Sequence, residues 1–260
     1  EDIPHGARNS IRIGDRRGAD AKELFLIDKL ASDQLNFFSG RSLGMLAGGF
    51  AIGASMANTQ FDRQIQNHFQ SGVRNATSDS WFEFLHANKE LGNGWITMPL
   101  FAGTWVAASQ YPDSPWMTKT SQWGERSIRT FVVGVPAVIL MQKLTGGSRP
   151  NDEAGSSHWD AWGDNHGVSG HSFMSAIPFI NAAKLTDNRM LKGALYGGSL
   201  LGALSRVNDN AHYPSQVALG WWLAYVASSA IDRTDSGKGN FQITPYFMGN
   251  GYGAMLEYRF

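Results

Sequence analysis

Three features are missing or scarce in this 260-residue sequence, and each narrows the class of protein. There is no cysteine, which excludes disulfide bonds, a thiol nucleophile and zinc–thiolate sites. There is no excess of charge, because 22 Lys and Arg balance 22 Asp and Glu. A nucleic-acid-binding surface normally shows a basic excess, so we expect no nucleic-acid partner.

Undiluted apolar runs are also scarce. Residues 43–61, 91–112 and 214–231 are free of charge and long enough to span a membrane, but Gly, Ser, Asn, Gln and Thr dilute them. The helices expected at 171–183 and 193–204 are only about 20 Å long at 1.5 Å per residue. A hydrocarbon core is about 30 Å thick. We therefore expect a soluble protein or a peripheral membrane contact rather than an integral membrane protein.

The spacing of apolar residues predicts one all-α helical bundle with a small C-terminal β-hairpin. Residues 1–20 are polar and predict an extended arm, and residues 21–235 predict the helical domain. Alternating residues on both sides of Asn250-Gly251 predict a hairpin within 240–260, packed on the same domain.

Helical periodicity, capping residues and breakers place the individual helices. We expect a buried, glycine-rich helix at 43–57 and a helix opened by a capping box at 80–83. Further helices are expected at 21–38, 95–109, 121–144, 170–184, 188–206 and 214–231. Residues 151–167 show no periodicity and predict a long loop, and long loops of compact domains are often functional.

Three polar segments stand at the expected helix ends: residues 142–150, 167–171 and 205–216. Ser169-Gly170-His171 would begin one helix, and His212 stands just before another with Pro214 in its first turn. Helix N-termini favour anions, and the guanidiniums of Arg149 and Arg206 would add positive charge. If these ends converge, they form a site for a phosphoryl group, with two histidines able to act as nucleophile and acid.

In order and spacing, the three segments resemble the type 2 phosphatidic-acid phosphatase and vanadium haloperoxidase superfamily. That family carries Lys, six residues and Arg-Pro; then Pro-Ser-Gly-His; then Ser-Arg, five residues, His, three residues and Asp. The resemblance covers about residues 131–231. It implies that His212 is the nucleophile that forms a phosphohistidine and that His171 is the general acid for the leaving oxygen. It implies phosphate contacts from Arg149, Arg206, Ser169 and the Gly170 N–H.

The sequence departs from the family pattern at three positions. Gln142 stands at the spacing of the family's Lys, and Lys143 follows it. One residue turns a helix face by about 100°, so Lys143 points away from the phosphate and Gln142 serves as a neutral donor. Val168 replaces Pro, and Gln216 replaces the Asp that orients the nucleophilic His. A glutamine oxygen accepts an imidazole N–H but stabilises imidazolium less than a carboxylate does, so we predict slower turnover and a gain on Gln216→Asp.

The resemblance implies hydrolysis of phosphomonoesters or diphosphates, on a small molecule or, as the glycine-rich helices favour, a lipid. It implies no metal and no cofactor, with vanadate as a phosphate mimic, and an extracytoplasmic location. The chain begins Glu1-Asp2 without Met, and we expect a processed or trimmed form. The oligomeric state stays open.

Alternative interpretations remain at this stage. A haloperoxidase would hold vanadate on His212, and a non-catalytic member would bind a phosphorylated lipid without turnover. The loop also carries four residues that could bind a metal, although their spacing matches no standard motif: His158, Asp160, Asp164 and His166. We favour a loop over the mouth of a phosphate pocket.

Overall fold

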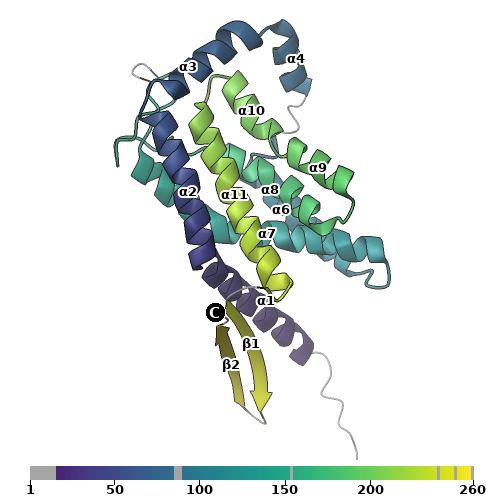
Figure 1. The fold of residues 1–260 in the computed structure, drawn as a ribbon. Helices are drawn as coiled ribbons and strands as arrows, with labels where there is room; N and C mark the ends of the chain where they lie inside the picture. The colour runs from purple at the N-terminus through teal and green to yellow at the C-terminus, as the bar shows by residue number, and fades with distance from the viewer. Residues whose placement is uncertain (1–15, 85–89, 153–154, 239–240, 249–250, 259–260) are drawn as a thin grey trace, which may run out of the picture.

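The structure is a computed structural model that describes residues 16–84, 90–152, 155–238, 241–248 and 251–258. In this part of the chain helices predominate and one antiparallel hairpin follows them (Figure 1). The predicted all-α bundle with a C-terminal hairpin is therefore confirmed.

The elements follow one another from the N-terminal to the C-terminal side. They are α1 (Arg16–Phe37), α2 (Gly40–Ala57), α3 (Phe61–His68) continued by the π-helical turn η1 (Phe69–Val73), α4 (Ala76–Phe84), α6 (Gly94–Ser109), α7 (Pro115–Thr145), α8 (Gly170–Leu185), α9 (Arg189–Gly198), α10 (Leu201–Asn208), α11 (Pro214–Asp235), β1 (Phe241–Met248) and β2 (Gly251–Tyr258).

Helix α11 is the centre of the bundle and packs against α1, α2, α7 and α8. Its residues Leu223 and Ala227 are buried against α8, where Phe173, Ile177 and Ile180 are also buried. This residue spacing of three and four is the pattern of a helix that buries one apolar face. The core therefore holds the N-terminal ends of α8 and α11 in fixed relative positions.

A buried ion-pair network fixes α1 to the bundle. The guanidinium of Arg129 on α7 is 1% exposed and donates to both oxygens of Asp33 on α1, at 2.7 and 2.8 Å. It also donates to Asp235 at the end of α11, at 2.8 Å. A buried ion pair needs such complete pairing to offset the loss of hydration.

Several predicted helix boundaries were wrong. Helix α1 begins at Arg16, so residues 16–20 are helical rather than an extended arm, and residues 1–15 lie outside the described residues. A single glycine in this segment costs only about 1 kcal/mol and does not stop a helix. The predicted capping box at Ser80 lies inside α4, because Asn75 caps that helix by accepting the N–H groups of Thr77 and Ser78.

Two other helices also differ from the prediction. Helix α7 begins at Pro115 rather than at residue 121, with Ser114 as its N-cap. The single helix expected at 188–206 is two helices, α9 and α10, which meet at Ser199 and Leu200. Gly197 and Gly198 weaken the helix there, and the Ser199 hydroxyl accepts a hydrogen bond from Trp221 at 2.8 Å.

The helix predicted at 43–57 is present as part of α2, but the prediction that this helix is buried was wrong. In α2 only Ser42, Phe50, Gly53 and Ala57 are buried, and Ile52 is 66% exposed. Of the described helices, α7 alone is long and apolar enough to cross a membrane, and 33% of that window is buried. None of the three stretches singled out by their lack of charge meets this test within the described residues.

The hairpin forms one residue away from the predicted turn. Met248 pairs with Gly251, so Gly251 belongs to β2 and the two connecting residues lie outside the described part. Strand β1 lies against α1, and the hairpin extends away from the rest of the bundle (Figure 1).

Candidate functional site: a histidine among four helix ends

Four helix ends come together where the three motif segments lie. Helix α7 ends at Thr145 and α10 at Asn208, whereas α8 begins at Gly170 and α11 at Pro214. The backbone N–H of Ser169 donates to the Gln216 carbonyl at 2.9 Å and thereby joins the two N-termini. A Cβ at position 220 would overlap the Ser169 carbonyl, so Gly220 permits this close approach.

Glycine also turns the chain after α7. Gly146 has φ of +60° and ends α7 in the left-handed conformation. The helix therefore stops at the glycine pair where the sequence predicted its end. The loop then folds back, with the N–H of Asp164 donating to Gly146 and that of His166 to Gly147, both at 3.1 Å. This part of the predicted loop therefore lies directly beside the end of α7.

A hydrogen-bond network fixes the orientation of the His212 ring. His212 is 4% exposed, and its Nδ1 lies 2.9 Å from Oε1 of Gln216. The same oxygen accepts the Tyr213 N–H at 3.1 Å, and Nε2 of Gln216 donates to the Ser148 carbonyl at 2.8 Å. Because a backbone N–H can only donate, this oxygen is an acceptor and Nδ1 of His212 carries the proton. The lone pair of the neutral ring is then on Nε2.

His212 is neutral at pH 7. Burial lowers its pKa to about 3, against the opposing effect of the Gln216 hydrogen bond. The positive charges of Arg206 and Arg149 lower the pKa further. A neutral imidazole in a positive surrounding is a competent nucleophile toward an anionic phosphate.

Both arginines have unused donors inside the site. The Nε atoms of Arg149 and Arg206 are buried and have no hydrogen-bond partner among the described residues. Arg206 also contacts Asp209 at 3.4 Å. Burial lowers the pKa of Arg206, and the charge of Arg149 lowers it further. Two like charges with buried free donors favour an anion between them.

The second motif forms the start of α8. The hydroxyl of Ser169 accepts the Ser172 N–H at 3.3 Å and so caps the helix, while Gly170 and His171 form its first turn. Ser169 is buried, whereas His171 is exposed to solvent. Of the two histidines at neighbouring helix starts, His212 is therefore buried and His171 faces solvent.

Gln142 and Lys143 differ in what they contact. The amide nitrogen of Gln142 donates to the Val168 carbonyl at 2.9 Å, which ties α7 to the start of α8 and puts this amide beside Gly170. Lys143 contributes its charge to the surroundings of His166 and lowers the pKa of that ring.

Sequence reasoning did not place His166 beside His212. Its ring centre lies 6.2 Å from that of His212, and the two rings are nearly perpendicular. Burial and then the charge of Arg149 lower the pKa of His166. The loop has no periodicity that could place its side chains. The one sequence feature that could have pointed to His166 is its position shortly before Ser-Gly-His. In the described part of the chain, no three His, Asp or Glu side chains gather into a group that could hold a metal.

Comparison with known proteins agrees with this geometry. Residues 118–234 match the family model described as the PAP2 superfamily, and the match contains all three motif segments. These residues therefore match the type 2 phosphatidic-acid phosphatase superfamily, as the motifs implied. This match supports a function of phosphatase or haloperoxidase type. Neither the comparison with curated proteins nor that with solved structures found a match.

Proposed function

We propose that the protein is a phosphatase that hydrolyses phosphomonoesters or diphosphates through a phosphohistidine at His212. The observation that supports this most directly is the neutral, buried imidazole of His212, whose Nδ1 proton is held by Gln216. With Nδ1 protonated, Nε2 is the atom that attacks phosphorus.

The two chemical steps assign one role to each histidine. Nε2 of His212 forms a bond to phosphorus as the bond from phosphorus to the leaving oxygen breaks, and His171 gives that oxygen a proton. Water then attacks the phosphohistidine, His171 takes the water proton, and phosphate leaves. Because His171 is exposed, it exchanges protons with solvent between the steps.

Residues of all three motifs stabilise the negative charge that develops on the phosphoryl oxygens. Arg149 and Arg206 supply free buried donors, and the start of α8 supplies the Gly170 N–H and the positive end of a helix. Ser169 positions that helix start, and Gln142 adds a neutral amide beside Gly170. These groups supply enough positive charge and donors to stabilise the phosphoryl transition state without a metal or other cofactor. Vanadate, as a phosphate mimic, binds at the same place.

We propose a lipid-linked phosphate as substrate and an extracytoplasmic, membrane-associated location. Superfamily members are often membrane-associated, and α7 is long and apolar enough to span a bilayer. An exposed apolar face on α2 supports the lipid class as well.

A hydrolysis panel tests the proposed activity. Phosphatidate, a polyprenyl diphosphate and a chromogenic phosphoester are assayed with chelator present, with and without vanadate. We expect phosphate release that chelator leaves unchanged and that vanadate inhibits, and at least a hundredfold loss in His212→Ala.

Other outcomes of the same panel would contradict the proposal. Full activity in His212→Ala would exclude this nucleophile. Oxidation of halide by peroxide that depends on added vanadate would identify a haloperoxidase instead. Phosphate binding without turnover of any ester would identify a non-catalytic member.

A further inference from the structure

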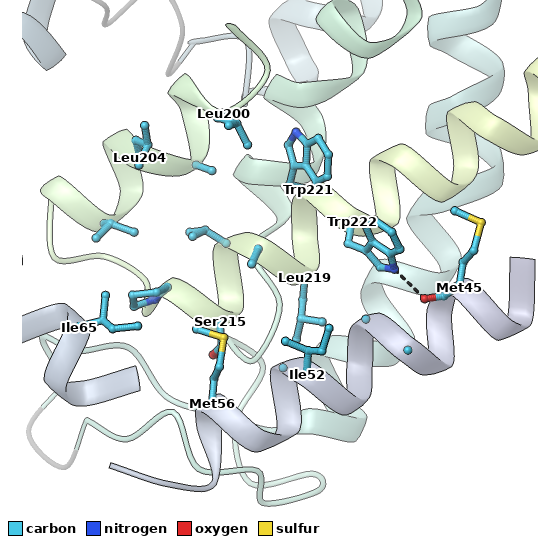
Figure 2. A pocket seen from close by; sticks show the side chains of 18 of the residues that line it. Met45, Ile52, Met56, Ile65, Leu200, Leu204, Ser215, Leu219, Trp221 and Trp222 are labelled. Carbon is cyan, nitrogen blue, oxygen red and sulfur yellow. Dashed lines mark hydrogen bonds between the residues drawn. The ribbon is translucent and has the colours of Figure 1, made fainter. Parts of the chain in front are cut away.

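Helix α11 presents two different faces at its N-terminal end, and only one of them belongs to the phosphate site. Figure 2 shows Ser215 and Leu219 on the face that lines an apolar groove beside α2. Gln216 and Gly220 follow them by one residue and lie on another face, since one residue turns a helix by about 100°. On that face Gln216 holds the His212 ring by a hydrogen bond. A further side chain that meets the phosphate therefore has to come from an element packed on this second face, not from the groove.

The loop between α7 and α8 brings His166 to this second face. The His166 N–H donates to the Gly147 carbonyl at 3.1 Å. At the next residue, Gly167, a Cβ would overlap the Thr145 hydroxyl, so the chain lies directly against the end of α7. The His166 backbone is fixed in this way, and its ring centre lies 6.2 Å from that of His212 with the ring planes at 75°.

The ring nitrogens of His166 are available to a ligand. Within the part of the chain that the structure describes, neither nitrogen makes a hydrogen bond to a protein group. The carboxylate of Asp164 approaches Nε2 to 3.8 Å, which is too far for a hydrogen bond. The His166 side chain is 28% exposed, so it is open to solvent although its backbone is held. An imidazole in this position can donate to an anion bound at His212.

Charges of both signs act on the His166 ring. Arg149 and Lys143 are the cations around it, and Asp164 and Asp152 are the anions. Burial has the largest effect and lowers the pKa of the ring, and the charge of Arg149 lowers it next most. The ring is therefore neutral at pH 7, like that of its neighbour at position 212.

A dianion bound at His212 would reverse this balance. It would lie between Arg149 and Arg206, whose buried Nε atoms have no partner among the described residues. There it would offset the positive charge of Arg149 at the His166 ring. Its own negative charge would favour the imidazolium form of that ring. His166 can therefore gain a positive charge at the moment when a phosphate needs one.

We propose that His166 is a third histidine of the phosphate site, which takes up a proton from solution as the phosphate binds and then donates a hydrogen bond to a phosphoryl oxygen. This role rests on the proposed function, because it takes the place of the phosphate at His212 as given. His166 binds the substrate, and neither attacks phosphorus nor protonates the leaving oxygen. By linkage, the affinity for a dianion rises by up to about tenfold for each unit that the pH falls, over the interval in which only the bound state holds the proton.

The titration of His166 with and without sulfate tests this role directly. Sulfate has the shape of phosphate and stays a dianion throughout the range in which histidine titrates. The imidazole C–H resonances are followed by NMR as the pH is varied, and the His166 signal is identified by its absence in His166→Asn. We expect saturating sulfate to raise the His166 midpoint by at least about one pH unit. His158, an exposed histidine of the same loop, is the internal control, and its midpoint should stay unchanged.

Three variants separate the charge of His166 from a merely structural role. His166→Lys carries a permanent cation, His166→Asn carries a neutral amide, and His158→Asn is the matched control. The Kd for sulfate is measured calorimetrically at pH 5.5 and pH 7.5, and the wild type and His158→Asn should bind more tightly at pH 5.5. We expect the ratio of the two Kd values to fall at least about threefold in both His166 variants. Only His166→Lys should keep or exceed the wild-type affinity at pH 7.5.

Several results would overturn the role of His166. One is a His166 midpoint that sulfate leaves unchanged. Another is a wild-type Kd ratio in His166→Asn, because a different group would then take up the proton. Equal loss of affinity in His166→Lys and His166→Asn with an unchanged ratio would show that the ring only supports the loop.

Hydrolysis assays distinguish a failure of this role from a failure of the proposed function. A His166 midpoint that responds to sulfate, without release of phosphate from any ester, would leave the role of His166 standing and reject the phosphatase. Phosphate release that His212→Ala abolishes, together with a His166 midpoint that sulfate does not move, would support the phosphatase and reject the role of His166.

Discussion

The contacts of Gln216 show how a single substitution in the family pattern is accommodated. Its oxygen accepts from His212 and Tyr213, and its nitrogen donates to the Ser148 carbonyl. A carboxylate at this position could take over the first two contacts but not the third. Glutamine therefore gains a structural hydrogen bond and gives up the charge that stabilises imidazolium.

Gln216→Asp should raise kcat and lower stability together. The carboxylate would raise the pKa of His212 and stabilise the cation that forms during attack, while Ser148 would lose its donor. We expect a decrease of about 1–3 kcal/mol in the free energy of unfolding. Steady-state kinetics and urea denaturation measure the two effects. A kcat that is unchanged or lower would contradict the role assigned to Gln216. Gln216→Leu is the control in which nothing orients the His212 ring, and it should lower kcat.

Stability should decrease as the solution becomes more acidic than about pH 6.5. The pKa of His212 is about 3 in the folded protein and near 6.5 in an unfolded chain, so between these values the unfolded state binds more protons. The free energy of unfolding therefore falls as the pH falls through this interval, and His166 contributes in the same direction. Urea denaturation at pH 7.5 and 4.5 measures the slope. His212→Gln should show a smaller slope, and equal slopes would argue against a buried neutral His212.

At the residue scale, the sequence predicted contacts that follow from the donors and acceptors of neighbouring side chains. It predicted that the Gln216 oxygen accepts the imidazole N–H, and that prediction is confirmed. It could not predict that His166 lies near His212, because that position depends on how the irregular loop is bonded to Gly146 and Gly147. Nor could it predict the amide of Gln142 bonded to Val168, since the contact joins segments 26 residues apart.

At the element scale, the candidate site depends on where the helices end rather than on how many there are. The stop after α7 at Gly146 and the start of α8 at Ser169 were predicted correctly, because glycine and serine have strong local preferences there. The start of α4 was predicted wrongly, since a capping box and Asn75 compete within a few residues. The outward-facing side of α2 was missed because apolar periodicity identifies a face but not what covers it.

Gly146→Ala should destabilise the protein. At φ of +60° a Cβ is strained, and it would also overlap the Asp160 carbonyl of the loop. We expect a loss of about 1–3 kcal/mol in urea denaturation. The matched substitution Gly103→Ala in α6 meets nothing within 4 Å and should instead stabilise by about 0.5–1 kcal/mol. Equal stabilities for the two variants would contradict the left-handed stop at the end of α7.

At the scale of the whole molecule, the surface of α6 and α7 supports contact with a membrane. Trp95 is 92% exposed and Trp116 74%, and Ile139 and Leu140 lie more than half exposed on α7. Tryptophan at the ends of apolar helices is typical of membrane interfaces. The search for charge-free runs did not single out α7, because Arg126 and Arg129 interrupt it. The side chains of both residues bond within the bundle.

We expect the protein to float with phospholipid vesicles in a density gradient. The double variant with Trp95→Ser and Trp116→Ser should bind several-fold less, because it loses the two largest exposed aromatic groups of this surface. Trp81→Ser on α4, which is 61% exposed, is the matched control and should float like the wild type. Wild-type protein that stays at the bottom of the gradient would rule out the contact.

The proposed mechanism depends most on a covalent bond between phosphorus and the His212 ring. Its most direct measurement is rapid quenching with a labelled phosphoester, followed by digestion and mass spectrometry under conditions that preserve phosphohistidine. We predict a phosphoryl group on the peptide that contains His212, accumulating further in His171→Ala with an activated ester because breakdown of the intermediate then lacks its base. Phosphate found on another residue, or turnover with no phosphorylated peptide at any quench time, would contradict the mechanism.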